Sequence, residues 1–416
     1  MGTASMNTKT LLFALSLSAC DVPVIRPIEV GVECASTSES SCPCGLAVAD
    51  TDRSQSANIA AASLNCQVLS PSVTSSASHP PGLTAALGGD IVFPSMPTES
   101  NELTLIDRYP KGVITWVNVS TAQVRGQLSL ATGYLSNPHD YVPITPNKAY
   151  VTRFNPNANA GREPFDGGSD ILIIDPRVPA ITGRIDLSSS FPPNGNFIIH
   201  PDRAWRVSDR VYVVLPLYDR GYMNSGEGYV VAIDPKNDSV IESDLLPGLS
   251  GCSGLAVAPD AASIAIVCSG RWQGSNSANN ASSGIVGLRL SPQLSEIWRV
   301  PASRVGSRAF GFDVAFVDAT HVLATQLGEL GPPVVNDVAY VIDVATGTGT
   351  PVLESSNTPV TLSVGPCSRA CGGCFIADAG RSRLYRLDFS NAQGSVITGY
   401  DWVDPTGLPP RSLAFF

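Results

Sequence analysis

Three cysteines near the C-terminal end of the chain have the spacing of a metal-ligating motif. Cys367, Cys371 and Cys374 are separated by three and then two residues, a spacing at which thiolates can hold an iron–sulfur cluster. The surrounding sequence argues against a cluster, because it predicts only strands in a chain exported to an oxidising compartment. Phe375 stands where attached c-type haem needs histidine, and no fourth ligand for zinc is near. We therefore predict no metal and no cofactor, and expect disulfides within this trio or to cysteines nearer the N-terminus.

A second pair of cysteines can be placed by geometry. Cys252 and Cys268 lie almost symmetrically about a Pro259-Asp260 turn. The two strands of such a hairpin bring them opposite each other, at about 4.5 to 5.5 Å between Cα atoms, which a disulfide can bridge. Closing a loop of this size is worth about 3 kcal/mol in the chain-entropy model. We predict this disulfide, and two free buried thiols are the alternative.

The other cysteines cannot be paired from the sequence. The chain has 10 cysteines, and setting Cys20 aside leaves an odd number, so one thiol is free or pairs with another chain. The cysteines without an assigned partner are Cys34, Cys42, Cys44, Cys66, Cys367, Cys371 and Cys374.

Cys20 belongs to a predicted export signal. Lys9 gives a weakly positive start, residues 11–17 form an apolar stretch too short to span a bilayer, and Leu17-Ser18-Ala19-Cys20 resembles a lipobox. The cysteine of a lipobox is lipidated and becomes the new N-terminus, and its acyl chains anchor the protein stably. An ordinary signal peptide with an incidental cysteine is the alternative. We expect a lipoprotein of the bacterial cell envelope, anchored through Cys20, at the periplasmic face or the cell surface.

Polar residues at the start of the predicted innermost strands are candidates for a ligand site. When the repeats described below are aligned on their turns, corresponding positions hold Asp140, Arg203, Ser253, Asp313 and Arg411, with His139 beside the first. Such a ring lies at the mouth of a central channel, where a concave site can form. The alternative is that these residues pair with one another and hold the structure together. We predict no catalytic residue, because no nucleophile elbow, phosphate loop, His-Glu-x-x-His or EF-hand motif is present.

The elements that position these residues repeat along the chain. Six segments share an apolar strand, often ending in Asp, then a polar turn and a second apolar strand; they begin at Ile114, Leu172, Val231, Val286, Val341 and Tyr385. An earlier hairpin precedes several of them, as in residues 141–152, 255–267 and 312–325. A period near 50 residues with four strands per repeat predicts an all-β propeller of four-stranded antiparallel blades.

The ends of the repeat region suggest how the ring closes. Residues 102–130 supply three strands without an innermost one, whereas residues 408–416 form a lone strand. We expect the C-terminal strand to complete that first blade, which removes exposed sheet edges. This favours six blades, with seven as the alternative if residues 83–95 contribute more than an entry strand. The expected organisation is a signal at 1–20, a Ser/Thr/Ala/Pro-rich tether with cysteines at 21–82 and a propeller at 83–416.

The repeats resemble those of the YVTN-repeat propellers, the bacterial surface-layer and quinoprotein-like group. The resemblance is carried by Lys148-Ala149-Tyr150-Val151-Thr152 and by Val341-Ile342-Asp343-Val344-Ala345-Thr346-Gly347, and extends loosely over residues 100–416. It implies the fold and is nearly silent on function, because propellers carry many activities.

Composition narrows the class of partner. A formal net charge of -10 argues against non-specific nucleic-acid binding, which needs a basic surface. We expect a binding or scaffold module whose protein or small-molecule partner meets a propeller face. The alternatives are a metal-dependent lactonase-type hydrolase, a quinoprotein-like oxidoreductase or a structural surface protein. A metal in the channel would have Asp140 and Asp313 available, but the arginines there would repel it.

Overall fold

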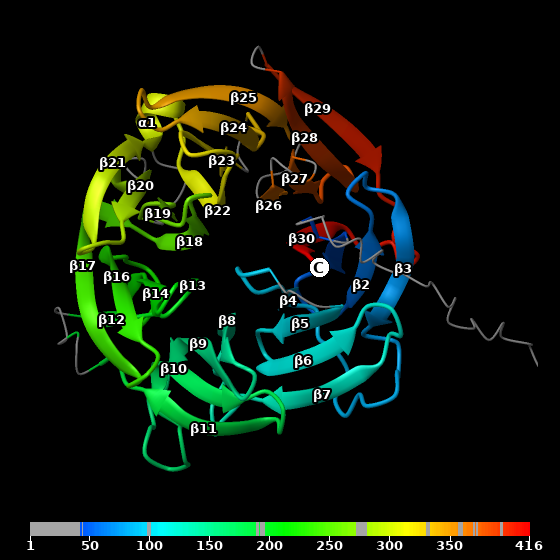
Figure 1. Ribbon diagram of the computed structural model, residues 1–416, viewed down its shortest axis with the longest axis vertical. Helices are drawn as coiled ribbons and strands as arrows, with labels where there is room; N and C mark the ends of the chain where they lie inside the picture. Colours follow the sequence, from blue (N-terminus) through cyan, green and yellow to red (C-terminus); the bar gives the residue numbers. More distant parts are fainter. Residues whose placement is uncertain are drawn as a thin grey trace, which may run out of the picture.

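The structure, a computed structural model, describes residues 42–416 with short gaps. The gaps are 44, 98–100, 189–190, 192–195, 272–280, 330–332, 357–360, 369–370, 372 and 392–393. The export signal with Cys20, and also Cys34 and Cys44, lie outside the described residues. The described residues form a closed ring of antiparallel sheets around a central channel (Figure 1). Among them, no helix is long and apolar enough to cross a membrane.

The ring contains seven four-stranded sheets in its described part, which we call blades 1 to 7. Blade 2 runs outward from β4 (Ile91–Val92) through β5 (Glu102–Asp107) and β6 (Val113–Asn118) to β7 (Val124–Ser129). Blade 3 consists of β8 (Pro138–Thr145), β9 (Lys148–Pro156), β10 (Gly168–Asp175) and β11 (Ala180–Ile185). Blade 4 consists of β13 (Ala204–Val207), β14 (Arg210–Leu215), β16 (Glu227–Asp234) and β17 (Ser239–Ser250).

The remaining blades follow the same order. Blade 5 consists of β18 (Cys252–Val257), β19 (Ser263–Cys268), β20 (Gly284–Arg289) and β21 (Ser295–Pro301). Blade 6 consists of β22 (Phe310–Phe316), β23 (His321–Gln326), β24 (Val338–Asp343) and β25 (Thr348–Glu354). Blade 7 consists of β26 (Leu362–Ser368), β27 (Gly373–Asp378), β28 (Arg383–Asn391) and β29 (Gly394–Asp401). A short pair, β12 (Phe197–Ile199) with β15 (Leu217–Asp219), and one helical turn, α1 (Ala302–Val305), complete the described elements.

Blade 1 corrects three of our expectations. Its outer strands are β1 (Leu46–Thr51), β2 (Ala57–Ala62) and β3 (Val68–Ser75), which lie in the segment that we expected to be a tether. Its innermost strand is the C-terminal β30 (Pro410–Phe415), so the C-terminal strand does close the ring, but on blade 1. The blade that begins near residue 102 has its own innermost strand, β4. The favoured count of six blades is therefore wrong, and the ring has seven.

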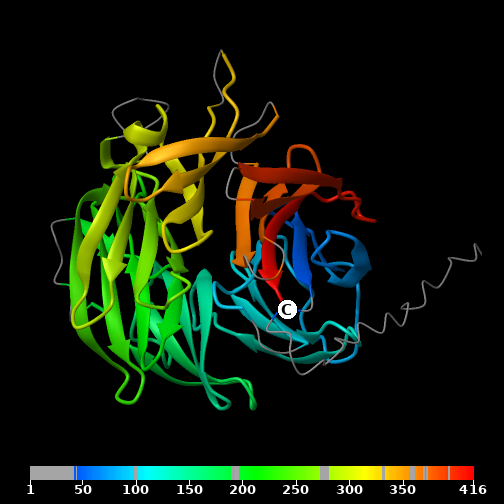
Figure 2. The ribbon, with the colours of Figure 1, turned by 45° about the horizontal axis from the view of Figure 1, so that its top comes forward.

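Packing between blades explains why short apolar strands suffice. In blade 1, the two middle strands β1 and β2 are buried along their whole length, so both of their faces are covered. The interface between blades 1 and 7 joins Leu46 and Val48 to Phe375 and Phe415 in one apolar cluster. Tilting the ring shows the sheets standing side by side about the channel (Figure 2). Burial of both sheet faces favours continuous apolar runs over strict alternation.

The aspartates that end many third strands have a local role. The carboxylates of Asp175, Asp234 and Asp343 each accept a hydrogen bond from the backbone N–H two residues later, at 2.8 to 2.9 Å. This contact stabilises the turn into the outermost strand, as Asp does in Asx turns. The repeated strand–Asp pattern is therefore a feature of turns and not of a site.

Three disulfides lie within the described residues. Cys252 and Cys268 are cross-strand partners on β18 and β19 and form the predicted disulfide. The C-terminal trio forms both kinds of disulfide that we expected. Cys367 bonds to Cys374 within the hairpin, and Cys371 bonds to Cys42, which lies before blade 1 in the sequence. Cys66 is a free, buried thiol, and burial raises its pKa to about 12. Its thiol therefore stays protonated at neutral pH.

Candidate binding site in the central channel

The innermost strands of all seven blades line one cavity of about 580 Å³ in the channel. This volume lies in the range of small-molecule sites. Its apolar wall includes Phe93, Trp205 and Phe312, the last with 38% of its surface exposed. The charged and ionisable lining residues are Arg53, Asp90, Arg108, His139, Asp202, Arg203, Asp313 and Arg411.

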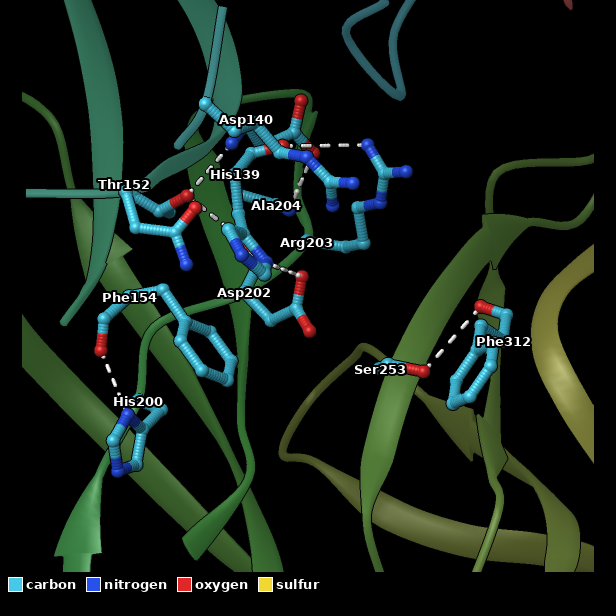
Figure 3. A network of polar contacts seen from close by, with 12 residues as sticks. His139, Asp140, Thr152, Phe154, His200, Asp202, Arg203, Ala204, Ser253 and Phe312 are labelled. Atoms are coloured by element: carbon cyan, nitrogen blue, oxygen red, sulfur yellow. Dashed lines mark hydrogen bonds and ion pairs between the residues drawn. The ribbon is translucent and has the colours of Figure 1, made fainter. Parts of the chain in front are cut away.

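The structure places five of the six predicted site residues at this cavity. They are His139, Arg203, Ser253, Asp313 and Arg411. Asp140 does not line it, because adjacent residues of a strand point to opposite sides and His139 takes the channel side. Figure 3 shows His139 with Asp202 on one side of the open space and Ser253 with Phe312 on the other.

Asp140 instead joins three segments of backbone. It is fully buried, its Oδ1 accepts from the N–H groups of Ser95 (2.9 Å) and Tyr141 (2.8 Å), and its Oδ2 accepts from that of Ala204 (2.8 Å). Burial raises its pKa, although Arg203 and these donors act against the rise. The contacts tie blades 3 and 4 to the segment that follows β4. Asp140 therefore belongs to the alternative that we left open, in which polar residues hold blades together.

We expect Asp140→Ala to lower the free energy of unfolding by about 3 kcal/mol. The substitution leaves three backbone N–H groups without their acceptor, and each unsatisfied buried donor costs about 1 kcal/mol or more. Urea unfolding of the variant measures the loss, with Asp260→Ala in an exposed turn as the control. An unchanged midpoint for Asp140→Ala would contradict this structural role.

His139 and Asp202 form a hydrogen-bonded pair at the channel wall. His139 Nδ1 lies 2.7 Å from Asp202 Oδ1, and the ring stacks on Phe154 with centroids 4.2 Å apart (Figure 3). Burial lowers the pKa of His139, against the opposing effect of Asp202. The neutral ring therefore donates its Nδ1–H to the carboxylate, which leaves Nε2 as the basic atom.

A second histidine, His200, contacts the phenyl ring on which His139 stacks. His200 donates from Nδ1 to the carbonyl oxygen of Phe154 (2.7 Å), and its ring lies 4.7 Å from that of Phe154 between centroids. Burial lowers the pKa of His200 to about 4, so it is neutral at physiological pH. Tyr218 and Tyr222 pack against His200 and extend the group of rings toward the surface. The stack fixes Phe154, and through it the orientation of His139.

The arginines at the channel differ in whether a carboxylate pairs with their positive charge. Arg108 pairs with Asp90 at 2.6 Å. Arg203 donates to the carbonyl oxygens of Phe93 and His139, both at 3.3 Å. Burial tends to lower the pKa of Arg203, but the field of nearby carboxylates raises it overall. In the part of the chain that the structure describes, Arg53, Arg203 and Arg411 form no ion pair with a carboxylate.

Four charged lining residues were missing from our candidates: Arg53, Asp90, Arg108 and Asp202. Arg53 lay in the expected tether, and Asp202 directly precedes a residue that we did select. A repeated Asp-Arg dipeptide could have identified two of them. Asp52-Arg53 follows β1, and Asp107-Arg108 stands at the end of β5; both dipeptides thus enter the turn between the second and third strands of their blade.

The described residues contain no group of three or more His, Cys, Asp or Glu side chains that could hold a metal ion.

Comparison with known proteins places the fold. No family model matches the sequence, and no curated protein matches it. A proposed 6-phosphogluconolactonase from Bacteroides fragilis matches with a TM-score of 0.52 and 13% identity, covering 92% of this chain and 99% of its own. A protein of Lactobacillus plantarum gives 0.51 and 12%, covering 89% and 99%; a functionally unknown protein of Desulfotomaculum acetoxidans gives 0.50 and 11%, covering 89% and 98%.

These matches confirm the propeller and nothing finer. Structural matches at 11 to 13% sequence identity support the fold alone and no activity, because proteins of one fold can have many activities. The assignment to the YVTN-repeat family stays a prediction.

Proposed function

We propose that this chain is a lipid-anchored binding module of the bacterial cell envelope, and that its ligand enters the central channel. The observation that carries the proposal is the cavity of about 580 Å³, where aromatic side chains and three arginines without an ion pair among the described residues come together from several blades. Small-molecule sites combine a largely apolar wall with a few polar groups in this way. The disulfides suit an oxidising compartment. Anchoring would use Cys20, and membership of the YVTN-repeat group would be consistent with an envelope role.

Ligand binding is tested by filling the channel. The purified protein is incubated with a small-molecule extract of bacterial cells, and retained compounds are identified by mass spectrometry. We expect Ser253→Trp, which places a large side chain at the cavity wall, to lose the retained compound. Val178→Trp, at a site with 67% exposure outside the cavity, should keep it. Equal retention by the wild type and Ser253→Trp would contradict a channel ligand.

Anchoring is tested separately. Cells that express the full chain are labelled with a radioactive fatty acid, and label on the protein should disappear in Cys20→Ala. Cys66→Ala serves as the control because Cys66 is buried in the folded body. Label that persists in Cys20→Ala would contradict lipidation at this residue.

A second candidate function, hydrolysis of an ester or lactone, is favoured by the His139–Asp202 pair. A histidine oriented by a carboxylate at Nδ1 can act as a general base toward water through Nε2. The proton abstracted from water would pass to His139, and Asp202 would stabilise the resulting imidazolium. As the acyl C–O bond breaks, the imidazolium would return this proton to the departing alkoxide oxygen. Arg203, beside this pair, could stabilise negative charge on the attacked carbonyl oxygen.

We expect His139→Gln to reduce any such hydrolysis at least 100-fold, the usual contribution of a general base. Turnover of a panel of esters and lactones is measured as a function of pH. His321→Gln is a matched control, because His321 forms a similar pair with Asp318 (2.9 Å) outside the cavity. Equal turnover for His139→Gln and the wild type would exclude His139 as the base.

A further inference from the structure

Two arginines that contribute to the channel meet where the ring closes. Arg53 lies in the turn between β1 and β2, and Arg411 lies on the C-terminal strand β30. Both line the cavity. Arg411 donates from Nε to the carbonyl oxygen of Thr51 (3.0 Å), and the Thr51 hydroxyl oxygen accepts from the backbone N–H of Arg53 (2.8 Å). Thr51 therefore holds both residues at one place on blade 1.

No carboxylate of the described residues forms an ion pair with either arginine. Asp52 lies between the strands, but its Oδ1 accepts from the N–H groups of Ser54, Gln55 and Ser56, which occupies it in the turn. Burial, and after it the positive charge of Arg53, lower the pKa of Arg411 to about 10. Arg108 adds to the positive field at Arg53, and the charges of Asp313, Asp90 and Asp337 oppose it. Two like charges thus face the cavity without an ion pair in the described part of the chain.

We propose that Arg53 and Arg411 bind a carboxylate or phosphate group of the channel ligand. The inference rests on the proposed function, since it names the chemistry of the ligand that the channel holds. Among the described residues, Arg411 donates only from Nε, so its terminal Nη1 and Nη2 groups remain as donors there. A guanidinium matches the paired oxygens of carboxylate and phosphate and binds them through two parallel hydrogen bonds. The cavity volume limits the ligand to a small molecule.

Asp313 provides a variant in which the affinity for an anion should rise instead of fall. It lines the same cavity, lies in the field of Arg53 and forms no ion pair within the described residues. Burial raises its pKa, while Arg203, Arg53 and Arg108 act in the opposite direction. A bound anion therefore competes with Asp313 for Arg53 and is repelled by its charge. Removing that charge should strengthen anion binding, whereas removing either arginine should weaken it.

The experiment measures binding of inorganic phosphate and of citrate to the full chain by calorimetry at low ionic strength. We expect Arg53→Gln and Arg411→Gln each to raise the Kd at least tenfold, and Asp313→Asn to lower it severalfold. Arg289→Gln, at an exposed position outside the cavity, should match the wild type. Binding of phosphate alone assigns a phosphate group, and binding of citrate alone assigns carboxylates. If Arg411→Gln does not fold, Arg53→Asn carries the test, because asparagine tolerates the positive φ of 59° there.

Two results would overturn the inference in distinguishable ways. Unchanged affinity in both arginine variants would place the anion elsewhere. A neutral compound that the wild type retains and Ser253→Trp loses, without phosphate or citrate binding, would overturn the anion site but keep the channel as a binding site. No retained compound and no anion binding would overturn the proposed function as well.

Discussion

Replacing Cys42 and Cys371 together by serine is expected to lower the free energy of unfolding by about 5 kcal/mol. The disulfide joins the start of blade 1 to the hairpin of blade 7 across 329 residues of sequence. In the chain-entropy model, a cross-link that closes so long a loop restricts the unfolded chain more than a short one does. Unfolding in urea, followed by fluorescence, measures the change in midpoint and in extrapolated stability.

A second disulfide in the same blade gives the matched control. Cys367 and Cys374 are only 7 residues apart, so the same model gives about 2 to 3 kcal/mol for their replacement by serine. Both double variants remove one disulfide and leave no lone thiol. Equal losses in the two variants would mean that loop length does not set the stabilisation.

The missed blade shows what hydrophobic patterning cannot detect. Residues 46–51 and 57–62 are Leu-Ala-Val-Ala-Asp-Thr and Ala-Asn-Ile-Ala-Ala-Ala, and small side chains make them resemble a linker. Both strands are nevertheless fully buried, because neighbouring blades cover their two faces closely enough that alanine fills the space. A strand buried on both faces has no alternation to find, and alanine has low strand propensity. The Val- and Ile-rich strands of the other blades, by contrast, could be recognised.

The spacing of the strands predicted which positions reach the channel, with an uncertainty of one residue along each strand. Aligning the turns located five of the seven innermost strands in the described part, and hence Arg203, Ser253, Asp313 and Arg411, but missed β4 and β26. Strand geometry then decides whether a residue or its neighbour faces the channel, and this separated His139 from Asp140. Contacts between distant segments, such as that of Arg411 with Thr51, arise only when the ring closes. No local pattern could have predicted them.

The same closure makes stability depend on one buried carboxyl. Asp50 lies fully buried on β1, opposite Asn58 of β2 and Pro410 of β30. Its Oδ1 accepts from Trp402 Nε1 (2.7 Å), whereas Oδ2 has no hydrogen-bond partner among the described residues, and neither has Asn58 Oδ1. Burial first, and Asp404 second, raise the pKa of Asp50 to about 8. Trp402 and Asn58 act in the opposite direction on this pKa, but burial outweighs them.

We expect Asp50 to lower the stability of the wild type as the pH rises from about 4 to about 8, whereas His139 and His200, whose pKa values burial lowers, act in the opposite direction. Unfolded Asp50 releases its proton near pH 3.8 and folded Asp50 near pH 8, so between these values folded Asp50 holds one more proton. The contribution of Asp50 to the free energy of unfolding then falls by about 1.4 kcal/mol per pH unit, on the order of 5 kcal/mol over the range, and levels off above pH 8. Asp50→Asn is neutral at every pH and should lack this slope.

Urea unfolding at pH 5, 6, 7 and 8 compares the two proteins, and the difference between them isolates Asp50 from other buried carboxyls. Asp401→Asn is the control, because its side chain is 78% exposed beside Arg383 and should leave the slope unchanged. Parallel curves for the wild type and Asp50→Asn would show that Asp50 is ionised in the folded state. A slope that changes only in Asp50→Asn would place the titrating proton on Asp50 of β1, the strand that pairs with the C-terminal β30 and so closes the ring.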